Sequence, residues 1–420
     1  MTERIAIIGG GPAGLSLARL LTARSELDVA VFEAAPRPGG KSFSFVQGDA
    51  VVEMGTCYTT RAHRIVLNWM KEAGIALKPL REQSFDDEDF LDYVKRGAGP
   101  SLPAQILRFL ADRRKLMNKL KRKPIADAAA AEAAQTTSEW LRARYLHKIE
   151  RFMYRSMTNL GYGFVDETPI VQAMRWNDLD LILTGLLKQL QMPVEGWTAF
   201  WERIAEPLNV RTSTAITRVE RVDGVARLHA STGETFEADH IVCAIPIDDF
   251  VRLADAPLED ETFAAEAIDW NGYTTTLVAT PEKFTASDVA AWSRALTPGA
   301  RTGQMMSARY DGYEADLGGH LYLTGQLSGD YSDPELEELL REEIAREGGE
   351  IANIVLQRTW KYFARYKPNA VRGGLLSRLE DMQGKQNTWY TGAAFSHEAV
   401  SNIVNYNARL ARKMQAALTS

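Results

Sequence analysis

A glycine-rich turn near the start of the chain has the composition of a phosphate-binding loop. Its residues are Gly9, Gly10, Gly11, Pro12, Ala13 and Gly14. In this pattern Gly9 allows a tight turn, Gly11 lets backbone approach a pyrophosphate, and Gly14 lets the next helix pack against the strand. Pro12 suits a first helical turn because its missing N–H needs no partner there. We therefore predict that this turn binds the pyrophosphate of a dinucleotide at a helix N-terminus.

The residues around the turn complete a strand–helix–strand unit. An apolar run from Arg4 to Ile8 leads into the turn, and a second run, Asp28 to Phe32, ends just before Glu33. Both runs are typical of buried parallel strands. A carboxylate after the second strand can accept a hydrogen bond from a ribose hydroxyl. The spacing predicts a dinucleotide-binding domain but does not distinguish NAD from FAD.

Strand and helix patterns alternate through the rest of the chain. Predicted strands flank a turn at residues 223–224 and cover 239–245, 274–279, 321–324, 360–366 and 388–391. Helical patterns cover 101–146, broken by Pro124 and an alanine-rich stretch at 127–134, and also 333–346 and 398–417. We therefore predict a discontinuous cofactor domain from residues 1–80, 192–250 and 380–420. Residues 81–191, largely helical, and 251–379 would form a substrate domain.

The composition limits the class of protein. With 45% hydrophobic and 25% charged residues, the 420-residue chain is an ordinary globular protein too long for one hydrophobic core. Its net charge of -6 argues against a nucleic-acid partner. Two cysteines cannot form a disulfide framework, no apolar run is long enough to span a membrane, and no metal-ligand spacing is visible. We expect a cytoplasmic protein without a bound metal.

The segment after the second strand narrows the cofactor. Glu33, Arg37, Gly39, Gly40 and Lys41 resemble the E-x-x-x-R-x-G-G-R signature of the flavin amine oxidase superfamily. The final arginine is replaced by lysine, which keeps the charge without the guanidinium fork. The resemblance implies a non-covalent FAD. It also implies an α/β fold in which a discontinuous Rossmann-like FAD-binding domain joins a mixed-sheet substrate domain with an inserted helical region.

The same resemblance assigns cofactor contacts elsewhere in the chain. It implies a glycine turn beside the flavin, a backbone segment against the adenine, and a final signature whose helix N-terminus faces the pyrimidine end of the ring. The residues so assigned are Gly55 and Thr56 for the turn, Ile216 for the adenine, and Gly392, Ala393, Val400 and Ser401 for the final signature.

Several motifs indicate the chemistry. Residues 161–163, 360–363 and 380–388 resemble those of bacterial FAD-containing polyunsaturated fatty acid isomerases and of the β-cyclopiazonate dehydrogenase group. We therefore expect an FAD-dependent oxidoreductase that moves a hydride from a carbon of a hydrophobic lipid, amine or alkaloid-like molecule onto the flavin. The alternatives are a redox-neutral double-bond isomerase of an unsaturated fatty acid-like substrate, a non-catalytic FAD-binding protein and, from the glycine turn alone, an NAD dehydrogenase.

Candidate substrate-site residues come from the same resemblance. It places Trp360, Tyr362 and Phe363 at the flavin, although the three also fit an ordinary strand core. Arg81 lies near the position of an arginine that holds a substrate carboxylate, or it pairs with the acidic residues that follow. His397 either faces the flavin as an acid or base, or is a capping or surface histidine.

A basic amphipathic segment covers residues 107–123. Lysines and arginines alternate there with leucine, phenylalanine and methionine. This pattern is typical of a solvated surface helix, and also of a helix that lies on a membrane surface and helps a lipophilic substrate to enter. Peripheral membrane contact and the oligomeric state are both left open.

Overall fold

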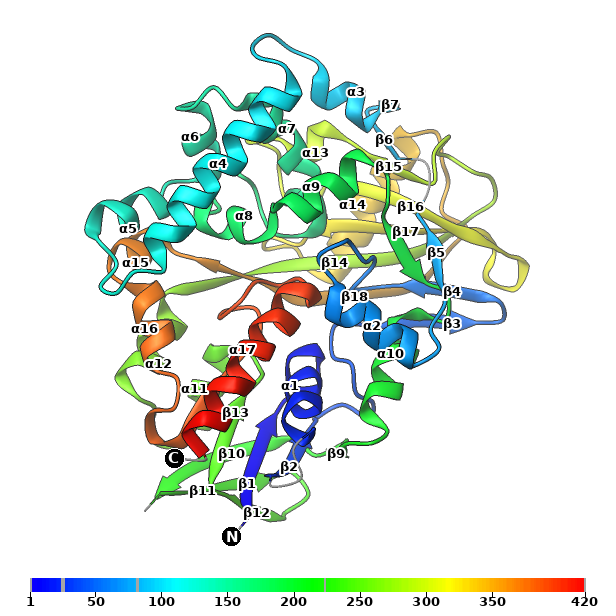
Figure 1. The fold of residues 1–420 in the computed structure, drawn as a ribbon. Coiled ribbons are helices and arrows are strands. Elements are labelled where there is room, and N and C mark those ends of the chain that lie inside the picture. The colour runs from blue at the N-terminus through cyan, green and yellow to red at the C-terminus, as the bar shows by residue number, and fades with distance from the viewer. Residues whose placement is uncertain (1, 24–26, 81–82, 223, 419–420) are drawn as a thin grey trace.

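The protein is built in three layers (Figure 1). A computed structural model describes residues 2–23, 27–80, 83–222 and 224–418. A parallel sheet lies at the end that holds both termini, a mixed sheet crosses the middle, and a cap of helices covers the far side (Figure 1). The predicted α/β class, with a parallel and a mixed sheet, is confirmed. The division into two domains stays a prediction.

The parallel sheet assembles strands from distant parts of the chain. In order across the sheet these are β19 (Thr388–Tyr390), β13 (His240–Cys243), β1 (Glu3–Ile8), β2 (Leu27–Phe32) and β9 (Asn209–Arg211). Ile5 in the central strand pairs with Val29 on one side and His240 on the other. The Arg4 guanidinium binds Asp239 over 2.9 Å and so ties two segments that are far apart in sequence.

Alternate residues of β1 face opposite sides of this sheet. Ile5 and Ile7 pack against α1 (Pro12–Thr22) and α17 (Val400–Leu418). Ala6 and Ile8 face a small antiparallel sheet of β10 (Ile216–Val222), β11 (Val225–Ala230) and β12 (Thr235–Ala238). The first and last long helices therefore lie side by side on one face of the sheet (Figure 1).

The mixed sheet is antiparallel except where β15 runs parallel to β6. Its strands in order are β18 (Asn353–Tyr366), β14 (Ile268–Thr280), β17 (Gly319–Leu327), β16 (Met305–Glu314), β15 (Val289–Ala291), β6 (Gln83–Phe85) and β7 (Glu88–Asp89). Two short ribbons, β3 (Ser44–Gln47) with β4 (Ala50–Glu53) and β5 (Leu77–Pro79) with β8 (Gln191–Pro193), connect the layers.

The cap contains α3 (Phe90–Lys95), α4 (Leu102–Leu120), α5 (Asp127–Ala133), α6 (Thr137–Arg142), α7 (His147–Ser156), α8 (Ile170–Trp176) and α9 (Leu179–Leu186). The alanine-rich stretch does not interrupt the helical pattern as predicted. It forms α5, because alanine has the highest helix propensity. The other helices include α2 (Arg64–Glu72), α10 (Gly196–Ala205), α11 (Ile247–Leu253), α12 (Glu259–Glu266), α13 (Ser293–Leu296), α14 (Asp333–Arg346), α15 (Pro368–Arg372) and α16 (Leu375–Asp381).

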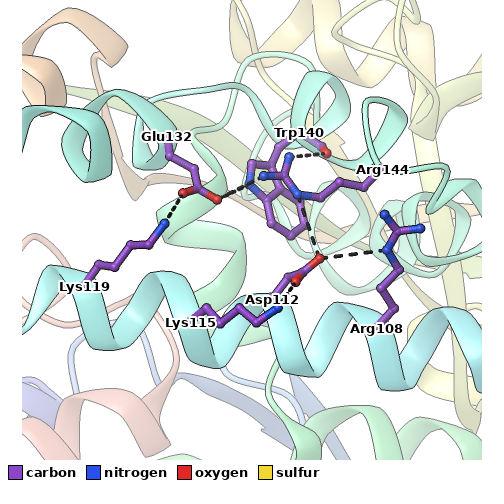
Figure 2. A network of polar contacts seen from close by, with 7 residues as sticks. All are labelled: Arg108, Asp112, Lys115, Lys119, Glu132, Trp140 and Arg144. Carbon is purple, nitrogen blue, oxygen red and sulfur yellow. Dashed lines mark hydrogen bonds and ion pairs between the residues drawn. The ribbon is translucent and has the colours of Figure 1, made fainter.

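A polar network fastens α4 to its neighbours in the cap (Figure 2). Asp112 lies among three basic side chains, from Arg108, Lys115 and Arg144. Glu132 binds Arg144 over 3.0 Å, and it also accepts from Lys119 and from the indole of Trp140, as Figure 2 shows. Carboxylates therefore balance part of the basic charge of segment 107–123.

Candidate active site

The glycine-rich turn brings the start of α1 against the end of β1. Gly9 has a φ of +110°, and its N–H donates to the carbonyl of Phe32 over 2.8 Å. A Cβ atom on Gly14 would lie 1.9 Å from the Gly9 carbonyl oxygen, so only glycine allows this approach. Gly11 caps α1 without a side-chain hydrogen bond, and Pro12 begins the helix. This uncapped helix N-terminus suits a phosphate group.

Glu33, directly after β2, holds the same turn. Its carboxylate accepts hydrogen bonds from the N–H groups of Gly10 and Ala35, each over 2.7 Å. A carboxylate has about four acceptor positions, so capacity is left for a further donor. The ribose contact expected of Glu33 stays a prediction.

A second glycine loop lies against the first. The Gly39 N–H donates to the Gly10 carbonyl over 2.8 Å, and a Cβ on Gly40 would lie 3.0 Å from the Cα of Gly11. Arg37 stabilises this loop from within: its guanidinium lies 4.4 Å from the centre of the Phe43 ring, and burial lowers its pKa. The two loops form one continuous backbone surface.

Lys41 joins this surface to the far end of the chain. Its ammonium group binds the buried carboxylate of Glu398 over 2.8 Å, just before α17, and lies 5.2 Å from the centre of the Tyr362 ring. A Cβ on Gly55 would lie 1.8 Å from the Lys41 carbonyl oxygen, which explains the glycine in the turn after β4. Glu398 was not predicted as a site residue. Its role depends on Lys41, which is remote in sequence, so no local motif marks it.

The final signature lies against the glycine-rich turn. Gly392 has a φ of +100° and faces Ala13. Asn407 of α17 donates to the Ala13 carbonyl over 2.7 Å. Val400 lines the cavity described below, and Ser401 is buried beside it. The start of α17 is thus fixed next to the start of α1.

Three further predicted contact residues are less central. Thr56 lines the cavity and shares a 2.8 Å hydrogen bond with Ser42. Ile216 begins β10 and is buried, and Ala393 packs into the same apolar cluster. The cofactor contacts expected of these residues stay predictions.

A cavity extends from these motifs between the mixed sheet and the cap. The start of α17 and the loop after β4 line one part. The remainder is lined by residues of the cap helices α3, α7, α8 and α9 and of the mixed-sheet strands β6, β14, β15, β16, β17 and β18. Most of its walls are apolar or aromatic, and the charged lining residues among those described are Arg155, Arg309 and Glu398. No group of three His, Cys, Asp or Glu side chains in the described ranges is placed to hold a metal ion.

The three residues predicted at the substrate wall take different positions. Tyr362 lines the cavity. Trp360 stands behind it and donates its indole N–H to Thr275, a lining residue, over 2.9 Å. Phe363 has a φ of +39° where the β14–β18 pairing is irregular, and this bulge lets both Tyr362 and Phe363 stack on Tyr162. Consecutive residues of a regular strand would point to opposite faces.

His397 is neither at the surface nor a helix cap, so that alternative is wrong. Only 2% of the residue is exposed, and its ring packs among Trp176, Tyr162 and Phe363 at centroid distances of 5.8, 4.9 and 5.4 Å. Neither ring nitrogen has a hydrogen-bond partner among the described residues. Burial, with a smaller effect of Arg175, lowers its pKa to about 3, so the ring is neutral.

His63 lines the cavity and was not anticipated. Its Nδ1 accepts a hydrogen bond from the backbone N–H of Thr60 over 3.0 Å, and burial lowers its pKa to about 4. Because a backbone N–H can only donate, Nδ1 carries no proton and the proton of the neutral ring lies on Nε2. His63 is therefore a hydrogen-bond donor through Nε2. It follows the glycine turn after β4 without any motif of its own.

Cys57 and Arg309 lie side by side in the cavity wall. The Arg309 guanidinium donates to the Cys57 Sγ over 2.8 Å and forms an ion pair with Asp311, also at 2.8 Å. Burial raises the pKa of Cys57 to about 11, so the group is a thiol at neutral pH. This argues against a nucleophilic thiolate. Arg81, expected to hold a carboxylate, lies outside the described residues.

Comparison with known proteins identifies related families and folds. A family model described as flavin containing amine oxidoreductase matches residues 12–400. Coproporphyrinogen III oxidase of Staphylococcus aureus is 45% identical over 56 residues, which are 13% of this chain and 12% of that protein. The chain therefore aligns with only a small part of that relative.

Solved structures of other proteins share the fold over almost the whole chain. The CLA-producing fatty acid isomerase from P. acnes has a TM-score of 0.82 and 22% identity, with 98% of each chain covered. Putrescine oxidase bound to putrescine has a TM-score of 0.72 and 16% identity, with 99% of each chain covered. At these identities the likeness establishes the fold. This similarity of fold confirms the predicted α/β architecture with a parallel and a mixed sheet.

Proposed function

The chain belongs to the flavin-containing amine oxidoreductase family, and from this premise we propose that it removes a hydride from a carbon of a hydrophobic small molecule. Its cofactor is FAD, as the family implies. The observation that carries the proposal is the cavity, which joins the cofactor motifs at Gly55 and Val400 to apolar and aromatic walls. We also propose that the enzyme works in the cytoplasm, on the basis of its low cysteine content.

The polar groups at the start of α17 fit a bound flavin. Both ring nitrogens of His397 and the Oε2 atom of Glu398 are buried without a hydrogen-bond partner among the described residues. Buried polar atoms rarely stay unpartnered in native proteins, and a flavin ring offers both donors and acceptors. We infer that the two glycine loops hold the pyrophosphate, Glu33 the ribose and the start of α17 the ring.

Bound FAD would supply the hydride acceptor. The protein would position the substrate carbon and exclude water from the cavity. Burial raises the pKa values of Tyr162, Tyr273 and Tyr362, so these rings stay neutral phenols that pack against a ligand or donate to it. His63 and His397 are neutral as well. Hydride removal from carbon requires close approach and exclusion of water, and it does not require a general base.

Isomerisation of a double bond is the second candidate. The P. acnes protein that shares this fold is a fatty acid isomerase, and a mainly apolar cavity suits an unsaturated chain equally well. In this case the hydride would return to another carbon of the same molecule.

Anaerobic single turnover separates the candidates. Purified enzyme with bound flavin is mixed with candidate lipids, amines and polycyclic alkaloids while the flavin absorbance is recorded. Oxidation moves a hydride to the flavin and releases a proton to solvent, so the flavin stays reduced and the product is lighter by two hydrogen atoms. Isomerisation leaves the product mass and the final flavin spectrum unchanged. A flavin that no candidate substrate reduces, with no product formed, would mark a non-catalytic FAD-binding protein and contradict the proposal.

A further inference from the structure

Arg155 is a cation in the cavity wall whose charge no described residue balances. It lies in the last turn of α7, lines the cavity and is only partly exposed. One guanidinium N–H donates to the backbone carbonyl of Ser84 on β6 over 3.2 Å, and the ring of Phe90 lies 5.7 Å away. Burial lowers the pKa of Arg155 to about 10, with smaller opposing effects of Tyr58 and Cys57 and none from a carboxylate of the described residues.

The other charged groups of the cavity are already paired. Arg309 is neutralised by Asp311 at 2.8 Å, and Glu398 by Lys41 at 2.8 Å. His63, also in the wall, is neutral. In the part of the chain that the structure describes, the cavity therefore carries a net single positive charge, located on Arg155. An unbalanced charge in apolar surroundings is costly unless a ligand balances it.

The free donors of Arg155 define the ligand chemistry. A guanidinium has five N–H donors, and one of them is used by the Ser84 carbonyl. The remaining planar donors match the two oxygens of a carboxylate. A single positive charge balances a monoanion, would leave a phosphate dianion partly unbalanced and would repel an ammonium group.

We propose that Arg155 binds the carboxylate of the substrate, so that the enzyme acts on apolar carboxylic acids rather than on amines. This inference rests on the proposed function and names the substrate class of that function. The acid group lies at the wall formed by α7, β6 and α3, and the apolar part of the molecule extends along the aromatic walls toward Tyr362 and the start of α17.

The test is ligand binding to the flavin-loaded enzyme by titration calorimetry. The probes are dodecanoate, methyl dodecanoate and dodecylamine, which share one chain and differ in the head group. The wild-type enzyme is expected to bind dodecanoate roughly ten- to a hundredfold more tightly than the other two. Arg155→Met should remove this preference and leave the ester affinity unchanged, while Arg155→Lys should retain part of it.

The matched control is Arg151→Met, one turn earlier on α7, whose guanidinium donates to the Tyr93 carbonyl over 3.3 Å and does not line the cavity. It should bind all three probes like the wild type. Equal binding of the acid by wild type and Arg155→Met, or equal binding of acid, ester and amine by the wild type, would overturn the proposal. Binding is measured without turnover, so failure of the flavin to be reduced would count against the proposed reaction alone.

Discussion

His397 is a buried group whose protonation differs between the folded and the unfolded chain at mildly acidic pH. Its pKa is lowered to about 3 in the fold, whereas an unperturbed histidine titrates near about 6.5. Between these values only the unfolded chain takes up the proton. The free energy of unfolding therefore falls as the pH falls from about 6.5 toward about 3.

We predict that His397→Phe weakens this acid sensitivity, because phenylalanine suits the aromatic surroundings and cannot be protonated. Between about pH 6.5 and about pH 4, the wild type should lose about 3 kcal/mol more of its free energy of unfolding than the variant. Urea unfolding of the flavin-free proteins across this pH range measures the difference. Parallel curves for the two proteins would show that His397 is not held neutral.

Alanine substitutions at Gly11 and Gly14 distinguish an effect on FAD binding from an effect on the stability of the fold. A Cβ on Gly11 would meet only the Gly40 Cα at 3.7 Å, an ordinary contact, and the φ of Gly11 is −80°. We predict that Gly11→Ala changes the free energy of unfolding of the flavin-free protein by less than about 1 kcal/mol but weakens FAD binding at least about tenfold, since the methyl group takes the place of the pyrophosphate.

Gly14→Ala is the contrasting variant. Its methyl group would meet the Gly9 carbonyl oxygen at 1.9 Å, so the flavin-free protein itself should unfold at lower temperature. Thermal unfolding and FAD titration of both variants provide the comparison. Wild-type FAD affinity in Gly11→Ala would remove this residue from the cofactor site.

At the scale of elements, Asn407 fastens α17 to α1. It donates to the Ala13 carbonyl and to the Ser16 hydroxyl, each over 2.7 Å, and accepts from Thr391. We predict that Asn407→Leu lowers the free energy of unfolding by about 2–4 kcal/mol and weakens FAD binding, because the starts of both helices belong to the same site. Asn405→Leu, on the exposed face of the same helix, is the control. Equal losses in the two variants would contradict this role.

The basic helix α4 is charge-balanced toward the cap but keeps an exposed Leu107. No helix in the described ranges is long and apolar enough to cross a bilayer. A peripheral contact through residues 107–123 stays a proposal.

We expect the balanced charges to make any such contact weak. The protein should remain in the supernatant with anionic vesicles at physiological salt. The Debye length is then about 8 Å, so attraction between the basic helix and the vesicle surface is screened beyond this distance. Co-sedimentation at low and physiological salt measures this. Pelleting at physiological salt that is lost in Leu107→Asp would establish a membrane contact instead.

Elements with strong local patterns could be predicted from the sequence. The helix α14 begins and ends as expected, because a serine with Glu335 three residues later forms a capping box and leucines recur on one face. The helix α5 was misjudged because alanine carries no periodic signal. The irregularity at Phe363 has no sequence signal at all, since it arises from the pairing of β18 with β14.

For the whole molecule, the cofactor motifs could be predicted and the substrate site could not. Glycines report backbone approach directly, so Gly14 and Gly55 point to close contacts from sequence alone. The roles of Arg155 and Glu398 depend instead on groups that other segments place around them. Such residues carry no local pattern, because charge balance in a cavity is a property of the assembled layers.

The order of strands in the parallel sheet also governs how the molecule can fold during synthesis. The central strand β1 is synthesised before the other strands of its sheet, yet its neighbour β13 follows far along the chain and β19, at the edge, follows β13. Pairings between such distant segments form slowly, because the entropy of closing a long loop is lost before the contacts between the strands can stabilise the structure. The apolar faces of β1 and α1 therefore stay exposed to solvent until β13, β19 and α17 have been synthesised and can cover them. This is the interval in which a nascent chain aggregates or recruits chaperones.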